Sequence, residues 1–287
     1  MTFTDELSEF NARHHFHQCQ VGGTTFDYLE TGPEHERTIM LLNGGMNCAL
    51  MWYKYLDALA DDYRVIAFDY PRTLTTSDAV ADGCVDLMHA LGVQRAVFVG
   101  ASYGGILAQV IARRHPEAVA GLALFATVGF TARTRSRLRR RYWMLPALLW
   151  YMGWCNYDRY KGWALKMTVR SCNAQSPAER QYVEDMLTEM FRDYTREKDQ
   201  HITRVILDLG FVAPITPEEL RDSDFQRSGR VRIILPRDDL FKAEDHRSLL
   251  ELFPHAIVTR VDGGHLSSEF DVDTHVNAIR AVCQNAW

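Results

Sequence analysis

The chain has 287 residues, of which 47% are hydrophobic, so it can bury a core large enough for one sizeable α/β domain or two small ones. Its formal net charge of -5 and its isoelectric point near 6.1 give no global reason to expect nucleic acid, and we expect a small-molecule partner. The six cysteines form no CxxC pair and no cysteine–histidine cluster at zinc spacing, so we expect no metal and a reduced, cytoplasmic protein.

The N-terminal half alternates between strand and helix patterns. The first residues include acidic side chains and no apolar stretch of signal-peptide length, so nothing marks the chain for export. Two segments of alternating polarity, 17–21 and 25–29, meet at Gly22-Gly23 and predict a β-hairpin. Mostly continuous apolar runs, typical of strands covered on both faces, follow at 38–42, 64–68, 96–99 and 119–125. Helical stretches between these runs predict a parallel sheet with right-handed crossovers.

The segment 131–214 contains no convincing strand and predicts a helical insertion that acts as a cap. One helix in it is well defined, because Ser176, Pro177 and Glu179 form a capping box with proline at the first helical position. Its most apolar stretch, 142–154, is 13 residues long and contains proline, so it is too short to span a bilayer.

The alternation resumes after the insertion. Strands are predicted at 231–235 and 256–261, and helices at about 243–252 and 269–284. The predicted fold is an α/β core of residues 1–130 and 215–287, interrupted by the cap of residues 131–214. Its sheet has eight mostly parallel strands with helices on both faces.

A candidate nucleophile stands at the end of the run 96–99. Gly100, Ser102 and Gly104 fit the pattern G-x-S-x-G, which chance places in a chain of this length on the order of 0.1 times. At a strained strand-to-helix elbow, the serine hydroxyl is exposed to a base, and the backbone N–H of Tyr103 points at any oxyanion that forms. The alternatives are a tightly packed glycine joint or a phosphate cradle, although a P-loop would have lysine where Ile106 stands.

An acid and a histidine should follow the serine in that order. Among eleven histidines, His265 alone stands just past a late apolar strand, in VTRVDGGHLSSEF, and we expect the others at the surface or at helix caps. Asp239, in IILPRDDLF, lies four residues after Leu235 and could reach the far nitrogen of that ring. We favour it over Asp238, which we expect to be a solvated turn residue. No acid lies just past the strand ending at Phe125.

A second oxyanion donor is expected in the loop after the strand 38–42, which reads LLNGGMN. Gly44 and Gly45 allow backbone N–H groups to turn inward there, and we favour the N–H of Gly45. An ordinary glycine turn is the alternative.

With these pieces in order, the chain resembles the α/β-hydrolase superfamily over nearly its whole length. The matching segments are LLNGG, GASYGG, LPRDDLF and GGHLSSEF. The resemblance implies a catalytic triad of Ser102, Asp239 and His265. It also implies an oxyanion hole made by the backbone N–H groups of Gly45 and Tyr103.

Two features depart from the common family pattern. Asn43 stands where the family usually has histidine, and FDYPRTLTTSD replaces the usual aspartate and glycine-rich stretch. The second feature, with YRVIAFDYP and GASYGGILAQ, looks more like the maspardin branch, some members of which are suspected of lacking catalysis. The resemblance therefore implies two functions, a working hydrolase or a non-catalytic binding protein.

The cap begins with six arginines between Arg133 and Arg141, followed by a segment rich in tryptophan. We favour a solvated face for the arginines over an anion site or a peripheral contact with a membrane surface. We expect most of the four cap tryptophans to bury the cap against the core: Trp143, Trp150, Trp154 and Trp163. Any cap tryptophan that instead faces the mouth of the site would line an apolar pocket over Ser102.

The leading interpretation is a cofactor-independent serine hydrolase that cleaves a carboxylic ester of a small, largely apolar substrate through an acyl-enzyme. The same triad serves thioesters, amides, acyl transfer and carbon–carbon bond cleavage, so these reactions stay open. Dehalogenases and epoxide hydrolases with an aspartate nucleophile are excluded by Ser102. The oligomeric state is open.

Overall fold

The computed structural model describes residues 3–171, 176–192, 194–221, 223–226 and 229–287. Parts of the predicted cap and core, and Cys172 among the six cysteines, therefore lie outside the described residues. The other five cysteines are free.

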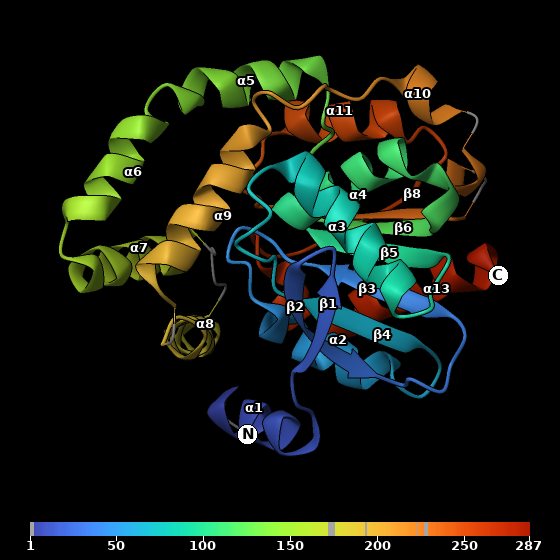
Figure 1. The fold of residues 1–287 in the computed structure, drawn as a ribbon, viewed down its shortest axis with the longest axis horizontal. Helices are drawn as coiled ribbons and strands as arrows, with labels where there is room; N and C mark the ends of the chain where they lie inside the picture. The colour runs from blue at the N-terminus through green and yellow to red at the C-terminus, as the bar shows by residue number, and fades with distance from the viewer. Residues whose placement is uncertain (1–2, 172–175, 193, 222, 227–228) are drawn as a thin grey trace.

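An eight-stranded sheet forms the centre of the molecule, in the order β1-β2-β4-β3-β5-β6-β7-β8 (Figure 1). The strands are β1 (His17–Val21), β2 (Thr24–Thr31), β3 (Thr38–Leu42), β4 (Arg64–Phe68), β5 (Ala96–Ala101), β6 (Val119–Phe125), β7 (Val231–Pro236) and β8 (Ile257–Val261). Strand β2 pairs antiparallel with both β1 and β4, and the other neighbouring pairs are parallel. The predicted mostly parallel eight-stranded sheet is confirmed.

Helices cover both faces of this sheet. They are α1 (Phe3–Arg13), α2 (Tyr53–Leu59), α3 (Ser77–Ala90), α4 (Tyr103–Arg114), α10 (Pro217–Arg221), α11 (Ala243–Leu252), α12 (Ser267–Phe270) and α13 (Val272–Ala286). Successive residues of a strand point to opposite faces, so Met40 joins a cluster with α3, α4 and α11 while Leu41 joins one with α1, α2 and α13. Helix α1 was not predicted, and the predicted last helix is broken at Asp271.

Helices α5 to α9 follow β6 in the chain; α5 to α8 form an arc beside the sheet, and α9 lies between this arc and the core (Figure 1). They are α5 (Ala132–Tyr142), α6 (Leu145–Trp154), α7 (Tyr157–Ser171), α8 (Pro177–Met190) and α9 (Arg196–Asp208). The predicted helical insertion is confirmed, and α8 begins as predicted, with Ser176 Oγ accepting a hydrogen bond from Glu179 N at 3.1 Å.

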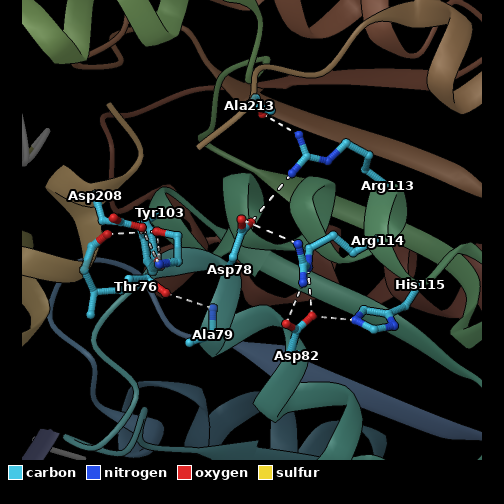
Figure 2. Close-up of polar contacts among 12 residues, drawn as sticks. Thr76, Asp78, Ala79, Asp82, Tyr103, Arg113, Arg114, His115, Asp208 and Ala213 are labelled. Carbon is cyan, nitrogen blue, oxygen red and sulfur yellow. Dashed lines mark hydrogen bonds and ion pairs between the residues drawn. The ribbon is translucent and has the colours of Figure 1, made fainter. Parts of the chain in front are cut away.

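The last helix of the insertion is joined to the core by hydrogen bonds at the start of α3 (Figure 2). The backbone N–H of Ser77 donates to Asp208 Oδ2 at 2.9 Å, and the Ser77 hydroxyl donates to the Val205 carbonyl at 2.8 Å. The same hydroxyl lies 3.1 Å from the hydroxyl of Tyr103, the first residue of α4. Helix α9 is thus held directly beside the start of α4.

Helices α3 and α4 are also joined by charged side chains (Figure 2). Arg114 pairs with Asp82 at 2.6 Å and with Asp78 at 3.5 Å, and His115 lies 2.7 Å from Asp82. All of these groups are partly exposed, and such pairs contribute at most about 1 kcal/mol each. The buried apolar residues between the two helices therefore do most to hold α4 in place.

The four tryptophans of the insertion are exposed, so the expectation that most of them bury it against the core is wrong. Trp143, Trp150, Trp154 and Trp163 are 76%, 67%, 79% and 59% exposed. Trp143 lies between α5 and α6, and the helices that carry the other three, α6 and α7, lie away from the sheet (Figure 1). Buried residues of α8 and α9, among them Leu187 and Val205, pack against the core instead.

Candidate active site

Ser102 stands between β5 and α4 with φ 54° and ψ -117°, in the left-handed region that side chains rarely adopt. Two glycines make this elbow possible, because a Cβ at Gly104 would lie 2.1 Å from the Leu42 carbonyl oxygen. A Cβ at Gly100 would lie 2.3 Å from the Gly104 carbonyl oxygen. The start of α4 can therefore pass directly over the end of β3.

Hydrogen bonds fix the Ser102 backbone on both sides. Its N–H donates to the Phe125 carbonyl at 3.0 Å, and its carbonyl accepts from Thr127 Oγ1 at 2.7 Å and from Gly105 N at 3.1 Å. Hydrogen bonds to the sheet and to the first turn of α4 thus hold Ser102 in its strained backbone conformation.

The structure brings His265 and Asp239 to this serine. His265 Nε2 lies 3.0 Å from Ser102 Oγ, and His265 Nδ1 lies 2.6 Å from Asp239 Oδ1. A carboxylate can only accept, so Nδ1 carries the proton, and Nε2 of the neutral ring presents its lone pair to the hydroxyl. This is the arrangement in which a histidine can take a proton from serine.

Asp239 is almost completely enclosed, with 1% of its side chain exposed, whereas the neighbouring Asp238 is exposed. Its second oxygen accepts a hydrogen bond from Nε2 of His246 in α11 at 3.2 Å. Burial opposes ionisation of Asp239, but the hydrogen bonds from His246 and His265 lower its pKa to about 2. The carboxylate is therefore ionised at neutral pH.

Sequence reasoning missed His246, because histidines other than His265 were expected at the surface or at caps. That expectation is wrong for His246, which is buried and contacts Asp239. Its position seven residues after Asp239, among the buried residues of α11, was the available signal.

The predicted oxyanion donors lie around the same serine. Tyr103 is the first residue of α4, so its N–H has no acceptor within the helix. Gly45 lies in the loop after β3 and lines a cavity together with Ser102 and Tyr103. The positive end of the α4 dipole faces the same place.

Asn43 ties the Gly44-Gly45 loop to the chain after β4. Its Nδ2 donates to the Phe68 carbonyl at 2.7 Å, and its own carbonyl accepts from the Tyr70 hydroxyl at 2.7 Å. Asn47 completes the link, since its Oδ1 accepts from Tyr70 N at 2.7 Å and its Nδ2 donates to the Tyr70 carbonyl at 3.1 Å. The two departures from the family pattern, Asn43 and FDYP, thus contact each other.

Two cavities meet at Ser102, and both are also lined by Gly45 and Leu240. The larger, of about 500 Å³, lies between the core and helices α5 and α9, and its apolar lining includes Ile106, Leu138, Ile206, Leu209 and Phe241. The smaller, of about 270 Å³, is lined by His265 and runs toward Trp52 and Glu269.

Several arginines of the predicted cluster have partners. Arg133 pairs with Glu244 and Arg137 with Asp245, so α5 is fastened to α11, and Arg137 also lines the larger cavity. Arg140 is exposed. Part of the cluster is therefore structural and part is a solvated face.

The described residues contain no group of three or more His, Cys, Asp or Glu side chains placed to hold a metal ion. Nor does any helix in the described part of the chain have the length and apolar character needed to cross a membrane.

Comparisons with known proteins identify the fold family. The alpha/beta hydrolase fold family matches residues 37–272. Epoxide hydrolase 3 of Xenopus tropicalis is 29% identical over 126 residues, covering 40% of this chain and 34% of that protein. The dihydrolipoyllysine-residue acetyltransferase component of the acetoin cleaving system of Cupriavidus necator is 32% identical over 137 residues, covering 45% of this chain and 36% of that protein. The chain thus spans about a third of the length of these curated relatives.

Solved structures agree on the architecture. A thermophilic esterase from Thermogutta terrifontis, solved with malate bound, superposes with a TM-score of 0.72 at 17% identity, covering 95% of this chain and 99% of that chain. The chain belongs to the alpha/beta hydrolase fold family, as its motifs predict. The likeness to the maspardin branch finds no support in these comparisons.

Substitution of Gly104 tests the elbow. We expect Gly104→Ala to lower the free energy of unfolding by about 2 kcal/mol, because its Cβ would meet the carbonyl oxygens of Leu42 and Asn43. Gly162→Ala in α7 is the matched control, since a Cβ there meets nothing within 4 Å and should stabilise the helix slightly. Denaturant unfolding of both variants gives the comparison, and equal effects would refute the crowding at Gly104.

The pKa of Asp239 predicts a pH-dependent contribution to stability. Because that pKa is lowered from 3.8 to about 2, the carboxylate stabilises the folded state above pH 3.8 and loses this effect as the pH falls toward 2. The difference in unfolding free energy between the native protein and Asp239→Asn should therefore shrink by about 2 kcal/mol over that range. Chemical denaturation at several pH values measures it. Asp238→Asn is the control, and a pH-independent difference for Asp239→Asn would contradict the assignment.

Proposed function

We propose that the chain is a serine hydrolase that cleaves carboxylic esters through an acyl-enzyme intermediate. The observation that supports this most is the continuous hydrogen-bonded chain from Ser102 through His265 to Asp239, at a strained elbow where α4 begins. The relatives in the same fold family include proteins named as hydrolases, but the substrate is our inference.

In the first half of the reaction, Ser102 Oγ attacks the ester carbonyl while His265 Nε2 takes the hydroxyl proton. The N–H groups of Gly45 and Tyr103 stabilise the oxyanion, and Asp239 stabilises the imidazolium. The tetrahedral intermediate then breaks its bond to the alcohol, which receives the proton from His265. A water molecule, deprotonated by the same histidine, attacks the acyl-enzyme, releases the carboxylic acid and restores Ser102.

The helical insertion supports a largely apolar acyl group. We assign residues 131–214 as a cap over a core of residues 1–130 and 215–287, because α5 and α9 contribute the outer wall of the larger cavity. Its apolar lining would exclude water from an alkyl or aromatic acyl chain. The reaction needs no cofactor or metal.

Other reactions use the same groups. Thioesters, amides and carbon–carbon bonds are cleaved by such triads, and a non-catalytic binding protein could keep the fold. An intact hydrogen-bonded triad favours catalysis over binding alone. A mechanism with an aspartate nucleophile would need a carboxylate where Ser102 stands.

A panel of p-nitrophenyl esters tests this proposal. We expect kcat/KM to rise from acetate to butyrate and longer acyl chains, because each added methylene enters the larger cavity. Ser102→Ala should lower kcat by about a thousandfold or more, and Ser8→Ala, on the exposed side of α1, should leave it unchanged. A strong preference for acetate would refute the acyl pocket. Equal activity of Ser102→Ala would refute the nucleophile.

A second function, binding to an anionic lipid surface, is favoured by helices α5–α7. From Ala132 to Ser171 the chain has ten basic residues and one acidic residue, although the whole chain has a net charge of -5. Exposed basic side chains on this segment include Arg140, Arg159, Lys166 and Arg170.

The same segment exposes large apolar and aromatic side chains: Trp143, Met144, Leu148, Trp150, Tyr151, Trp154, Trp163 and Met167. Helix α6 contains no charged residue. Tryptophan rings next to basic groups are typical of surfaces that lie in the headgroup region of a bilayer. We therefore propose a peripheral contact with anionic lipid through this face, which also brings the larger cavity near its substrate source.

Sedimentation with vesicles tests this contact. We expect native protein to bind vesicles of phosphatidylcholine that contain phosphatidylserine. Binding to vesicles of pure phosphatidylcholine, or to the mixed vesicles at high salt, should be at least about tenfold weaker. The double variant Trp150→Ser/Trp154→Ser should lose this binding, and Trp287→Ser, which alters an exposed tryptophan at the C-terminus, should keep it. Absence of binding would refute the proposal. A dimer in analytical ultracentrifugation that the double variant loses would assign the face to a second copy of the chain.

A further inference from the structure

A buried carboxyl group lies in the smaller cavity beside the candidate triad. Glu269 belongs to α12, four residues after His265, and only 7% of the residue is exposed. It lines the cavity of about 270 Å³ together with Ser102 and His265. The mechanism above does not use this group.

Among the described residues, no side chain or backbone group forms a hydrogen bond or ion pair with the Glu269 carboxylate. The Lys54 ammonium group donates to the Glu269 backbone carbonyl at 3.3 Å and pairs with the Glu6 carboxylate at 3.6 Å. Tyr55 donates its hydroxyl to the Ser268 carbonyl at 2.8 Å. Burial raises the pKa of Glu269 to about 7, while Lys54 opposes the rise.

A buried carboxylate without a partner is costly to keep, and such a group in a cavity is complementary to a cation that enters it. Trp52 lines the same cavity, and an indole ring beside an ammonium group adds a favourable cation–π interaction. The remaining lining includes the apolar Met46, Met51 and Leu266. Charge and lining thus suit a compact ammonium group on a short carbon chain.

The position of His265 indicates which part of the substrate this cavity receives. The histidine that lines it delivers the proton to the leaving alcohol, so the alcohol portion lies on that side of the scissile bond. The acyl chain then occupies the larger cavity between the core and the helices α5 and α9.

We infer that the smaller cavity selects esters whose alcohol portion carries a cationic amine, and that Glu269 is the residue that determines this specificity. The inference rests on the proposed function, because it takes the position of the leaving group from the roles of Ser102 and His265. It adds the chemical class of the alcohol.

The test uses two butyrate esters of the same shape, the choline ester and its all-carbon isostere, in which a quaternary carbon replaces the ammonium nitrogen. In buffer more alkaline than the pKa of Glu269, native protein should prefer the choline ester in kcat/KM by at least about tenfold. Glu269→Gln should lose this preference and retain or improve hydrolysis of the neutral isostere. Glu251→Gln, an exposed substitution in α11, is the matched control and should keep the native preference.

Binding separates this inference from the proposed function. Calorimetric titration of both esters into Ser102→Ala should show tighter binding of the choline ester, and Glu269→Gln added to that variant should abolish the difference. If native protein hydrolyses both esters equally, and Glu269→Gln changes neither, the inference is overturned while the hydrolase stands. Selective binding without hydrolysis in native protein would support the amine site and refute the hydrolase. Absence of both hydrolysis and selective binding would refute both.

Discussion

The backbone conformation of Ser102 is the constraint on which the rest of the site depends. A non-glycine residue at φ 54° costs on the order of 1–3 kcal/mol, and it persists here because Gly100 and Gly104 admit the close crossing of α4 over the end of β3. The same turn points the hydroxyl at His265 and starts a helix whose first N–H, that of Tyr103, has no acceptor within the helix. The strained backbone of Ser102 therefore positions the nucleophile, its contact with the base and the oxyanion donor. A relaxed backbone at this position would separate all three.

Two buried carboxyl groups lie near the candidate active site, and they differ in their hydrogen-bond partners: Asp239 contacts His265, whereas Glu269 lines the smaller cavity. Asp239 accepts hydrogen bonds from two histidines, which lowers its pKa to about 2 and fixes the orientation of His265. No described residue donates a hydrogen bond to the Glu269 carboxylate, and burial raises its pKa to about 7. The hydrogen bonds that Asp239 accepts come from the protein itself, whereas we propose that a cationic ligand supplies the partner of Glu269. This contrast underlies the separate roles that we assign to the two acids, orientation of the base and selection of the alcohol.

Periodicity and spacing predicted the sheet, the elbow and the insertion, because strand runs and glycine positions are local features of the sequence. Spacing also favoured Asp239 over its neighbour, and it is Asp239 that contacts His265, although its catalytic role stays a prediction. The contact of His246 with Asp239 and the enclosure of Glu269 could not be predicted, since both depend on how distant segments pack. Exposure of Trp154 was missed for a similar reason. An apolar run shows that a side chain avoids water, but not whether the protein or another surface covers it.

Covalent labelling tests the central claim, that Ser102 is a nucleophile activated by His265, most directly. A fluorophosphonate probe reacts with activated serines and needs no knowledge of the substrate. We expect native protein to take up one label, peptide mapping to place it on Ser102, and His265→Gln to slow the reaction by about a hundredfold or more. Ser102→Ala should take up none. Failure of native protein to label, or equal labelling of Ser102→Ala, would show that Ser102 is not an activated nucleophile.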